Sequence, residues 1–226
     1  MKIIIVGALA KKRYFPSNLD DCEVWGLNAI YQDWIPRWDR RFNLHTYENL
    51  QRYKWRPEFF EREANFSEEN PTVPFYTIDE WPDPYRLGWQ SSQKDSLFPY
   101  ERLINEQPRG KYHCGSFDWM VAFVVWIHSC WGYEFASQRP NEIAIHGVSL
   151  MMEAGEPLSA RACLEYWCGF AEGQGIKITV AEDSALFDFY HLVRSDLCYG
   201  LDDTPVFEDR RSFSPNKDKA PYDYEE

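Results

Sequence analysis

Six residues that could hold or transform a small molecule share one kind of position in the sequence. Each follows a short apolar segment or precedes a long one. They are Gly7, Asn28, His45, Gly115, Ser116 and Gly147. In an open α/β sheet, the loops after the strands and the N-termini of the helices meet at the carboxyl edge, where ligands bind. We therefore expect these six residues to gather at one edge of a sheet and to form a binding site there.

The pair Gly115-Ser116 is placed to bind a phosphate. A helix that begins with Gly-Ser offers free backbone N–H groups and a hydroxyl to an anion. Gly7 and Gly147 allow the backbone to come close to a ligand, although each could equally serve only to close a turn. The Asn28 amide could recognise a base or a ribose, or could cap the next helix. These five residues are the predicted nucleotide-binding residues.

His45 is the predicted catalytic residue. Its imidazole has an unperturbed pKa of about 6.5, so it could accept a proton from a hydroxyl at neutral pH. A histidine that serves only to complete the core is an equally good interpretation of this position. Hydrolytic chemistry is disfavoured, because Ser116 lacks the Gly-x-Ser-x-Gly motif and no Cys-His-Asn order is present.

Charged residues near a later helix supply further candidates for the cleft. Glu153, Arg161 and Glu165 surround the expected start of that helix. Arg161 and Glu165 have i,i+4 spacing, which by default makes an ordinary pair on one helix face. The basic run at residues 11–13 could meet phosphates, although a short cationic run more often faces solvent.

No cofactor or metal is predicted. The loop after Gly7 reads Ala-Leu-Ala-Lys-Lys, so the Gly-x-Gly-x-x-Gly dinucleotide motif is absent. No clear Asp-x-Asp motif demands a metal, and Asp202-Asp203 belongs to the polar end of the chain. The six cysteines form no Cys-x-x-Cys pair, which favours reduced thiols that fill the core over a zinc site.

Short apolar or alternating segments predict the elements that position these residues. The expected strands cover residues 2–6, 23–27, 41–45, 73–77, 141–148 and 176–180. The expected helices cover residues 48–63, 117–131 and 157–172. Ser116 should be the N-cap of the second helix, and Gly173 and Gly175 should end the third. Residues 79–93 show neither the period of 2 of a strand nor the period of 3.6 of a helix. They therefore predict a long irregular loop, of the kind that often forms a lid.

This order of elements predicts a single Rossmann-like α/β domain, residues 1–201, in which helices flank a mostly parallel sheet. The length of 226 residues suits one domain. Residues 202–226 are acidic, polar and proline-containing. We expect them to form a tail that is flexible or becomes ordered on a partner.

The charge balance bears on the partners. The chain has 24 Lys and Arg residues against 36 Asp and Glu residues, a formal net charge of −12, which disfavours duplex nucleic acid. The longest apolar run, Trp119–Ile127, is far shorter than the roughly 20 residues that a membrane span needs. The amino end has no signal-peptide pattern. We therefore expect a cytoplasmic protein.

The order of the motifs resembles a known group of proteins. The strand that ends at Gly7, the segment Glu23–Tyr31, and Gly115–Met120 leading through an apolar helix to Glu142–Val148 resemble the bacterial sialyltransferase-like Rossmann proteins. They are more similar to a group of uncharacterised phage proteins. A strand like Gly173–Ile178 recurs in that group, with a His-ended third strand and an Arg-containing helix. The similarity covers roughly residues 1–185.

The resemblance implies a nucleotide-sugar donor, with Gly7, Asn28, Gly115 and Ser116 touching the nucleotide. Helix N–H groups and Ser116 would stabilise the leaving phosphate. A histidine would take the proton of the acceptor hydroxyl, and we prefer His45 over His113, His146 and His191. We therefore expect a nucleotide or nucleotide-sugar binding protein, a phage-type glycosyltransferase-like enzyme if it is catalytic. The alternative is a non-catalytic phage accessory protein that sequesters a nucleotide. Such a protein could instead bind a host or virion protein through its aromatic surface or its tail.

Overall fold

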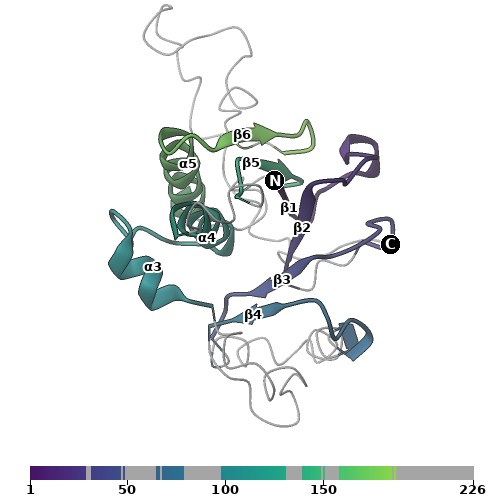
Figure 1. Ribbon diagram of the computed structural model, residues 1–226, viewed down its shortest axis with the longest axis horizontal. Coiled ribbons are helices and arrows are strands. Elements are labelled where there is room, and N and C mark those ends of the chain that lie inside the picture. The colour runs from purple at the N-terminus through teal and green to yellow at the C-terminus, as the bar shows by residue number, and fades with distance from the viewer. Residues whose placement is uncertain are drawn as a thin grey trace, which may run out of the picture.

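A parallel sheet forms the centre of the molecule. The computed structural model describes residues 1–28, 32–46, 48, 65, 66, 68–78, 98–130, 139–148, 150, 158–184 and 186. Within these residues, six parallel strands lie in the order β4-β3-β2-β1-β5-β6 (Figure 1). They are β1 (Lys2–Val6), β2 (Cys22–Leu27), β3 (Arg40–Asn43), β4 (Phe75–Thr77), β5 (Glu142–His146) and β6 (Lys177–Val180). The predicted α/β class with a parallel sheet is confirmed.

Three helices and one short 3₁₀ helix accompany the strands in the described residues. They are η1 (Lys12–Tyr14), α3 (Tyr100–Glu106), α4 (Ser116–Cys130) and α5 (Leu158–Gly173). The sequence predicted α4 and α5 but not α3. The expected helix at 48–63, the loop at 79–93, Glu153 and the tail at 202–226 lie wholly or mostly outside the described residues.

The ends of β2 and β3 follow from where their backbone pairing stops. β3 ends at Asn43 and does not reach His45 as expected. Its partner β2 ends at Leu27, which is paired with Phe42, and the next residue, Asn28, turns away with a φ of 50°. At the other side of the sheet, β6 is an edge strand with partly exposed residues, as its alternating polarity predicted.

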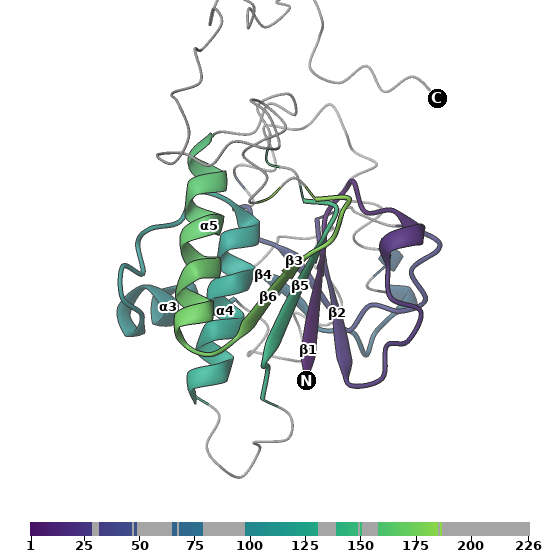
Figure 2. The ribbon, with the colours of Figure 1, turned by 90° about the horizontal axis from the view of Figure 1, so that it is seen from above.

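The two faces of the sheet are covered differently. Helices α3, α4 and α5 lie on one side, which we call the helix face, and η1 lies on the other (Figure 2). Alternate residues of β1 separate the two faces, because Ile3 and Ile5 belong to the core under the helices and Ile4 and Val6 to a smaller cluster. That second side, which we call the loop face, is covered by η1 and by the described residues 32–39.

Strand order reverses between β1 and β5, because β2 to β4 lie to one side of β1 and β5 and β6 to the other. In parallel sheets, the loops that follow the two strands at such a point, here β1 and β5, run in opposite directions from the carboxyl edge, and ligands bind between them. Within the described residues, no helix has the length and hydrophobicity that crossing a membrane would require.

Candidate functional site

Gly7 and Gly147 meet where the strand order reverses. The Gly7 N–H donates to the His146 carbonyl at 2.7 Å, and the Leu9 N–H donates to the Gly147 carbonyl at 3.0 Å. Gly147 has a φ of 64°, and a Cβ on it would overlap the Ala10 backbone. A Cβ on Gly7 would likewise overlap the Gly147 carbonyl group. Close packing of two backbones therefore explains both glycines, which favours the turn interpretation of each.

A carboxylate accepts hydrogen bonds from two backbone N–H groups in the loops that follow β1 and β5. Asp183 Oδ1 accepts the Gly147 N–H at 2.9 Å, and Asp183 Oδ2 accepts the Lys11 N–H at 2.7 Å. Ser184 Oγ accepts the neighbouring Val148 N–H at 3.1 Å. An anion that approaches the Gly147 amide therefore has to displace the carboxylate of the chain itself.

The start of α4 is arranged in the same way. Asp118 is buried, and its Oδ2 accepts the N–H groups of Cys114 at 2.8 Å and Gly115 at 3.2 Å. Its Oδ1 accepts the Trp119 N–H at 2.7 Å. The predicted free N–H of Gly115 is therefore occupied, and Ser116 is the first residue of α4 rather than its N-cap. A buried carboxylate needs these donors, and it accepts stronger hydrogen bonds than a serine hydroxyl does.

Aromatic rings pack beside this helix start. The His113 ring stacks on Trp119 with centroids 3.5 Å apart and on Trp167 with centroids 4.8 Å apart. His113 Nδ1 lies 3.7 Å from Asp118 Oδ1. The Trp167 indole N–H donates to the Tyr112 carbonyl at 2.9 Å. Side chains of the protein therefore fill the space around the first turn of α4.

At the ends of β2 and β3, two side chains have buried polar atoms without a partner among the described residues. Asn28 donates its backbone N–H to the Phe42 carbonyl at 2.7 Å, while its buried side-chain Oδ1 has no hydrogen-bond partner among the described residues. Asn43 is fully buried. Its Oδ1 accepts the His45 N–H at 3.4 Å, but its Nδ2 finds no partner in the described part of the chain.

Two further polar side chains near the carboxyl edge share this property. Gln32 Nε2 donates to the Ala8 carbonyl at 3.2 Å, whereas the buried Gln32 Oε1 has no partner within the described ranges. His146 ends β5 and is buried against Phe15, with ring centroids 5.6 Å apart. Its Nδ1 also lacks a described partner. Buried polar atoms usually have hydrogen-bond partners, and these four have none among the described residues. On the helix face, Gln107 Oε1 and both ring nitrogens of His113 share this property.

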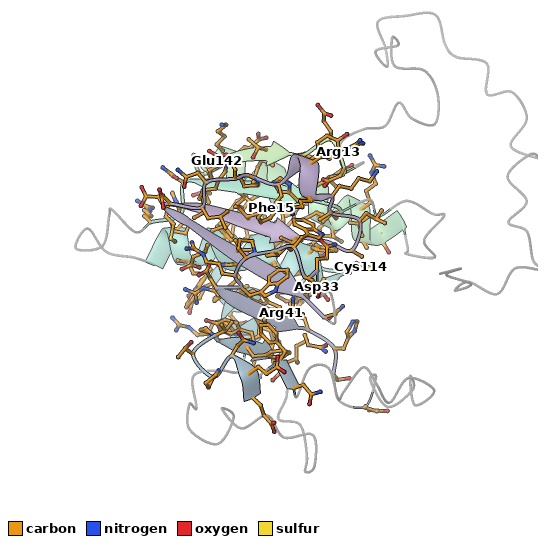
Figure 3. All side chains as sticks on the ribbon, turned by 90° about the vertical axis from the view of Figure 1, so that its right-hand side faces the viewer. Arg13, Phe15, Asp33, Arg41, Cys114 and Glu142 are labelled. Carbon is orange, nitrogen blue, oxygen red and sulfur yellow. The ribbon has the colours of Figure 1, made fainter. Side chains whose placement is uncertain are left out.

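A buried cation lies beside Asn28. Arg41 on β3 is fully buried, and its guanidinium occupies the space that a side chain on Gly26 would fill. It donates to the Asn28 carbonyl oxygen and lies over the Trp38 ring, 4.9 Å from the centroid. Figure 3 looks onto the loop face and shows Arg41 with Phe15 in front of the sheet. The glycine in β2 is therefore what admits a charged side chain to this face.

Both histidines at this edge are suited to accept a proton. Burial lowers the pKa of His45. Burial also lowers the pKa of His146, against the opposing effect of the Asp183 carboxylate. Each imidazole is therefore neutral near pH 7. His45 is the predicted base, and its backbone N–H bonds to Asn43.

The remaining sequence candidates lie on the helix face. Arg161 Nε bonds to Glu165 Oε1 at 2.7 Å within α5, which is the ordinary i,i+4 pair. Gly115 and Ser116 belong to the start of α4 on the same face. Gly7, Asn28 and Gly147 instead follow β1, β2 and β5 at the carboxyl edge, and His45 follows β3 with its backbone N–H bonded to Asn43.

Sequence reasoning missed three residues that define this edge, namely Asp183, Gln32 and Asn43, and it left His146 as one of several candidate histidines. For Asn43 a signal was present, because the polar residues Arg41 and Asn43 alternate with the apolar residues Phe42 and Leu44. Alternation places both on one face, and that face proves to be buried. Asp183 gives no comparable signal, because its partners are distant in sequence.

Comparisons with protein-family models, with curated proteins and with solved structures found no match. Among the described residues, no group of three or more His, Cys, Asp and Glu side chains is arranged to hold a metal ion. The function has therefore to be inferred from the geometry of the carboxyl edge.

Proposed function

We propose that the chain binds a nucleotide or nucleotide sugar at the carboxyl edge of β1, β2, β3 and β5, on the loop face. One observation carries the proposal. Four buried side-chain atoms, Asn28 Oδ1, Gln32 Oε1, Asn43 Nδ2 and His146 Nδ1, have no hydrogen-bond partner among the described residues. His146 ends β5 and Gln32 bonds to the loop after β1, where strand order reverses, whereas Asn28 and Asn43 lie at the ends of the neighbouring β2 and β3. The point of reversal is the usual binding position in such sheets.

The chemistry of these atoms favours the nucleoside part of the ligand. The amide oxygens of Asn28 and Gln32 can accept hydrogen bonds from ribose hydroxyls or an exocyclic amine. The Asn43 amide can donate to a ring nitrogen or a carbonyl, and neutral His146 can do either according to its tautomer. All four groups are uncharged, so they suit a base and a sugar better than a phosphate.

The phosphate would be held by side chains rather than by helix amides. The N–H groups of Gly115 and Gly147 already bind Asp118 and Asp183. The exposed basic run at residues 11–13 begins beside the Asp183 contact and continues into η1 on the loop face. This run is the source of positive charge that a phosphate on this side of the sheet would meet.

The occupied amides also bear on catalysis. Glycosyl transfer from a nucleotide sugar needs donors that stabilise the leaving phosphate, and the predicted donors at Gly115 are taken by Asp118. This favours the second candidate function, a protein that sequesters a nucleotide without turnover. If turnover occurs, His45 is the proposed base, because burial keeps it neutral.

Thermal unfolding with a panel of nucleosides, nucleotides and nucleotide sugars at millimolar concentration tests the proposal. A ligand at about 100 times its Kd stabilises the fold by about 2.7 kcal/mol, which raises Tm by about 5 °C or more. The absence of any shift across the panel would overturn it. A nucleoside, which has no phosphate, should retain most of the increase in Tm, because the four protein atoms are expected to bond to the base and the sugar.

Gln32→Leu should reduce the shift by removing one acceptor. Gln107→Leu is the matched control, because Gln107 Oε1 is also buried without a described partner, while its Nε2 bonds to the Ala122 carbonyl of α4 on the helix face. Equal losses in the two variants would contradict the assigned position. Donor hydrolysis or transfer that disappears in His45→Ala with binding retained would identify an enzyme, whereas binding without turnover in the parent would identify sequestration.

A further inference from the structure

Two thiols meet at the starts of α4 and α5. Cys114 is exposed and lies just before α4, and Cys163 is buried in α5. Cys114 Sγ donates to Ser159 Oγ at 2.9 Å, and Ser159 lies one helical turn before Cys163. Figure 3 shows Cys114 at the end of the sheet opposite Glu142, which begins β5.

The loop before α4 packs on the side of α5 that carries Cys163. A Cβ placed on Gly115 would lie 3.3 Å from the Ala160 Cβ, and Cys114 bonds to Ser159. Ser159 and Ala160 lie four and three residues before Cys163, so the three residues share one side of the helix. Burial, the Asp118 carboxylate and the Cys114 thiol raise the pKa of Cys163 to about 11. The thiols of Cys114 and Cys163 are therefore neighbours, with Asp118 beside them.

We propose that Cys114 and Cys163 form an oxidation site, in which a hydroperoxide converts the two thiols to a disulfide that joins the loop before α4 to α5. This site lies on the helix face and is independent of the nucleotide proposal. Its expected substrate is a small hydroperoxide, because only Cys114 of the pair is exposed to solvent.

The exposed thiol reacts first and the buried thiol resolves the product. The Cys114 sulfur attacks the terminal peroxide oxygen, and the S–O bond forms as the O–O bond breaks. The thiol proton passes to the leaving oxygen, so the products are Cys114 sulfenic acid and the alcohol, or water when hydrogen peroxide is used. The Cys163 sulfur then attacks the sulfenic sulfur, and the S–O bond breaks as the S–S bond forms. The Cys163 proton passes to the neighbouring Asp118 carboxylate and leaves with the hydroxyl group as water. Two thiols are thus oxidised while one peroxide is reduced.

Peptide mapping of the full chain tests the proposal directly. The native protein is treated with hydrogen peroxide, its remaining thiols are alkylated, and it is digested without reduction. We expect a linked peptide pair that contains Cys114 and Cys163, while Cys168, which is buried in the same helix, stays reduced. In Cys163→Ser the link should be lost and a sulfenic-acid probe should label Cys114. Cys168→Ser is the matched control and should retain the link.

Two outcomes would overturn the proposal. One is oxidation of Cys114 to sulfinic acid, or to a disulfide with another cysteine, while Cys163 is recovered alkylated. The other is no reaction at Cys114. Because the mapping of the parent protein needs no substitution, these outcomes do not depend on whether the variants fold.

Discussion

The two faces of the sheet differ in how their side chains pack. On the helix face, large rings interlock, and Trp25, Phe42 and Phe123 lie in mutual contact with centroids 5.1–6.1 Å apart. On the loop face, a small apolar cluster around Ile4 and Val24 lies beside buried polar side chains. Dense apolar packing stabilises a fold, whereas incompletely satisfied polar groups weaken it and mark sites. The helix face therefore supplies most of the apolar packing, and the proposed function places ligand recognition on the loop face.

Neighbouring residues of β1 can test this division most strongly. Ile3 and Ile4 are both fully buried, the first on the helix face and the second on the loop face. Ile3→Ala should cost about 5 kcal/mol of unfolding free energy and Ile4→Ala about 2 kcal/mol, because irregular segments collapse more readily around a lost side chain. Denaturant unfolding measures both values. Equal costs would mean that the two faces contribute equally to stability.

A second pair compares a glycine at the edge with a glycine in the scaffold. Gly147→Ala should cost on the order of 3 kcal/mol, because φ is positive and the added Cβ overlaps the Ala10 backbone. Gly169→Ala in α5 should instead stabilise the protein by about 0.5–1 kcal/mol, because no atom lies within 4 Å of the new Cβ. Thermal unfolding of the two variants should give shifts of opposite sign.

The two internal carboxylates provide a smaller contrast. Asp118→Ala removes the acceptor of three backbone N–H groups from a buried position and should cost about 2–3 kcal/mol. Asp183→Ala removes the acceptor of two, one of them exposed, and should cost about 1 kcal/mol.

Inorganic phosphate should partly restore the Tm of Asp183→Ala by binding the two vacated amides, and chloride at equal ionic strength is the control. If phosphate stabilises the parent protein as strongly, the carboxylate does not occupy an anion site.

The loop face should also determine the response to acid. Burial lowers the folded-state pKa of His45 and His146, whereas both titrate at about 6.5 in the unfolded chain. Below that pH the unfolded chain binds more protons, so the unfolding free energy falls as pH falls, by at most about 1.4 kcal/mol per pH unit for each histidine. His146→Gln should make this slope shallower between pH 6.5 and the folded-state pKa. An unchanged slope would show that His146 protonates equally well in both states.

The strands were predictable because burial imposes a simple pattern. β1 and β5 are apolar and β-branched because helices and loops cover both of their faces, and the sequence shows this directly. α4 was predictable for the same reason. α3 was missed because Leu103 alone among its residues is buried, so no apolar stripe reveals it.

The site was less predictable because its hydrogen bonds join distant parts of the chain. Position alone correctly placed Gly7, Asn28 and Gly147 at the carboxyl edge. That Asp183 would accept the Gly147 and Lys11 N–H groups depends on how two loops meet, which no local pattern encodes. That Asp118 would accept the Cys114 and Gly115 N–H groups likewise depends on the folded geometry of the loop before α4.

The order of the strands has a consequence for biosynthesis. As the chain leaves the ribosome, β1 can pair with β2 early, because Lys2 pairs with Cys22. Its other edge must wait for β5, since Lys2 also pairs with Glu142. An apolar strand edge that stays open through most of translation is a template for association with other nascent chains. Slowing synthesis before residue 142 should therefore favour aggregation, and a chaperone that covers β1 during this interval should improve the yield of folded protein.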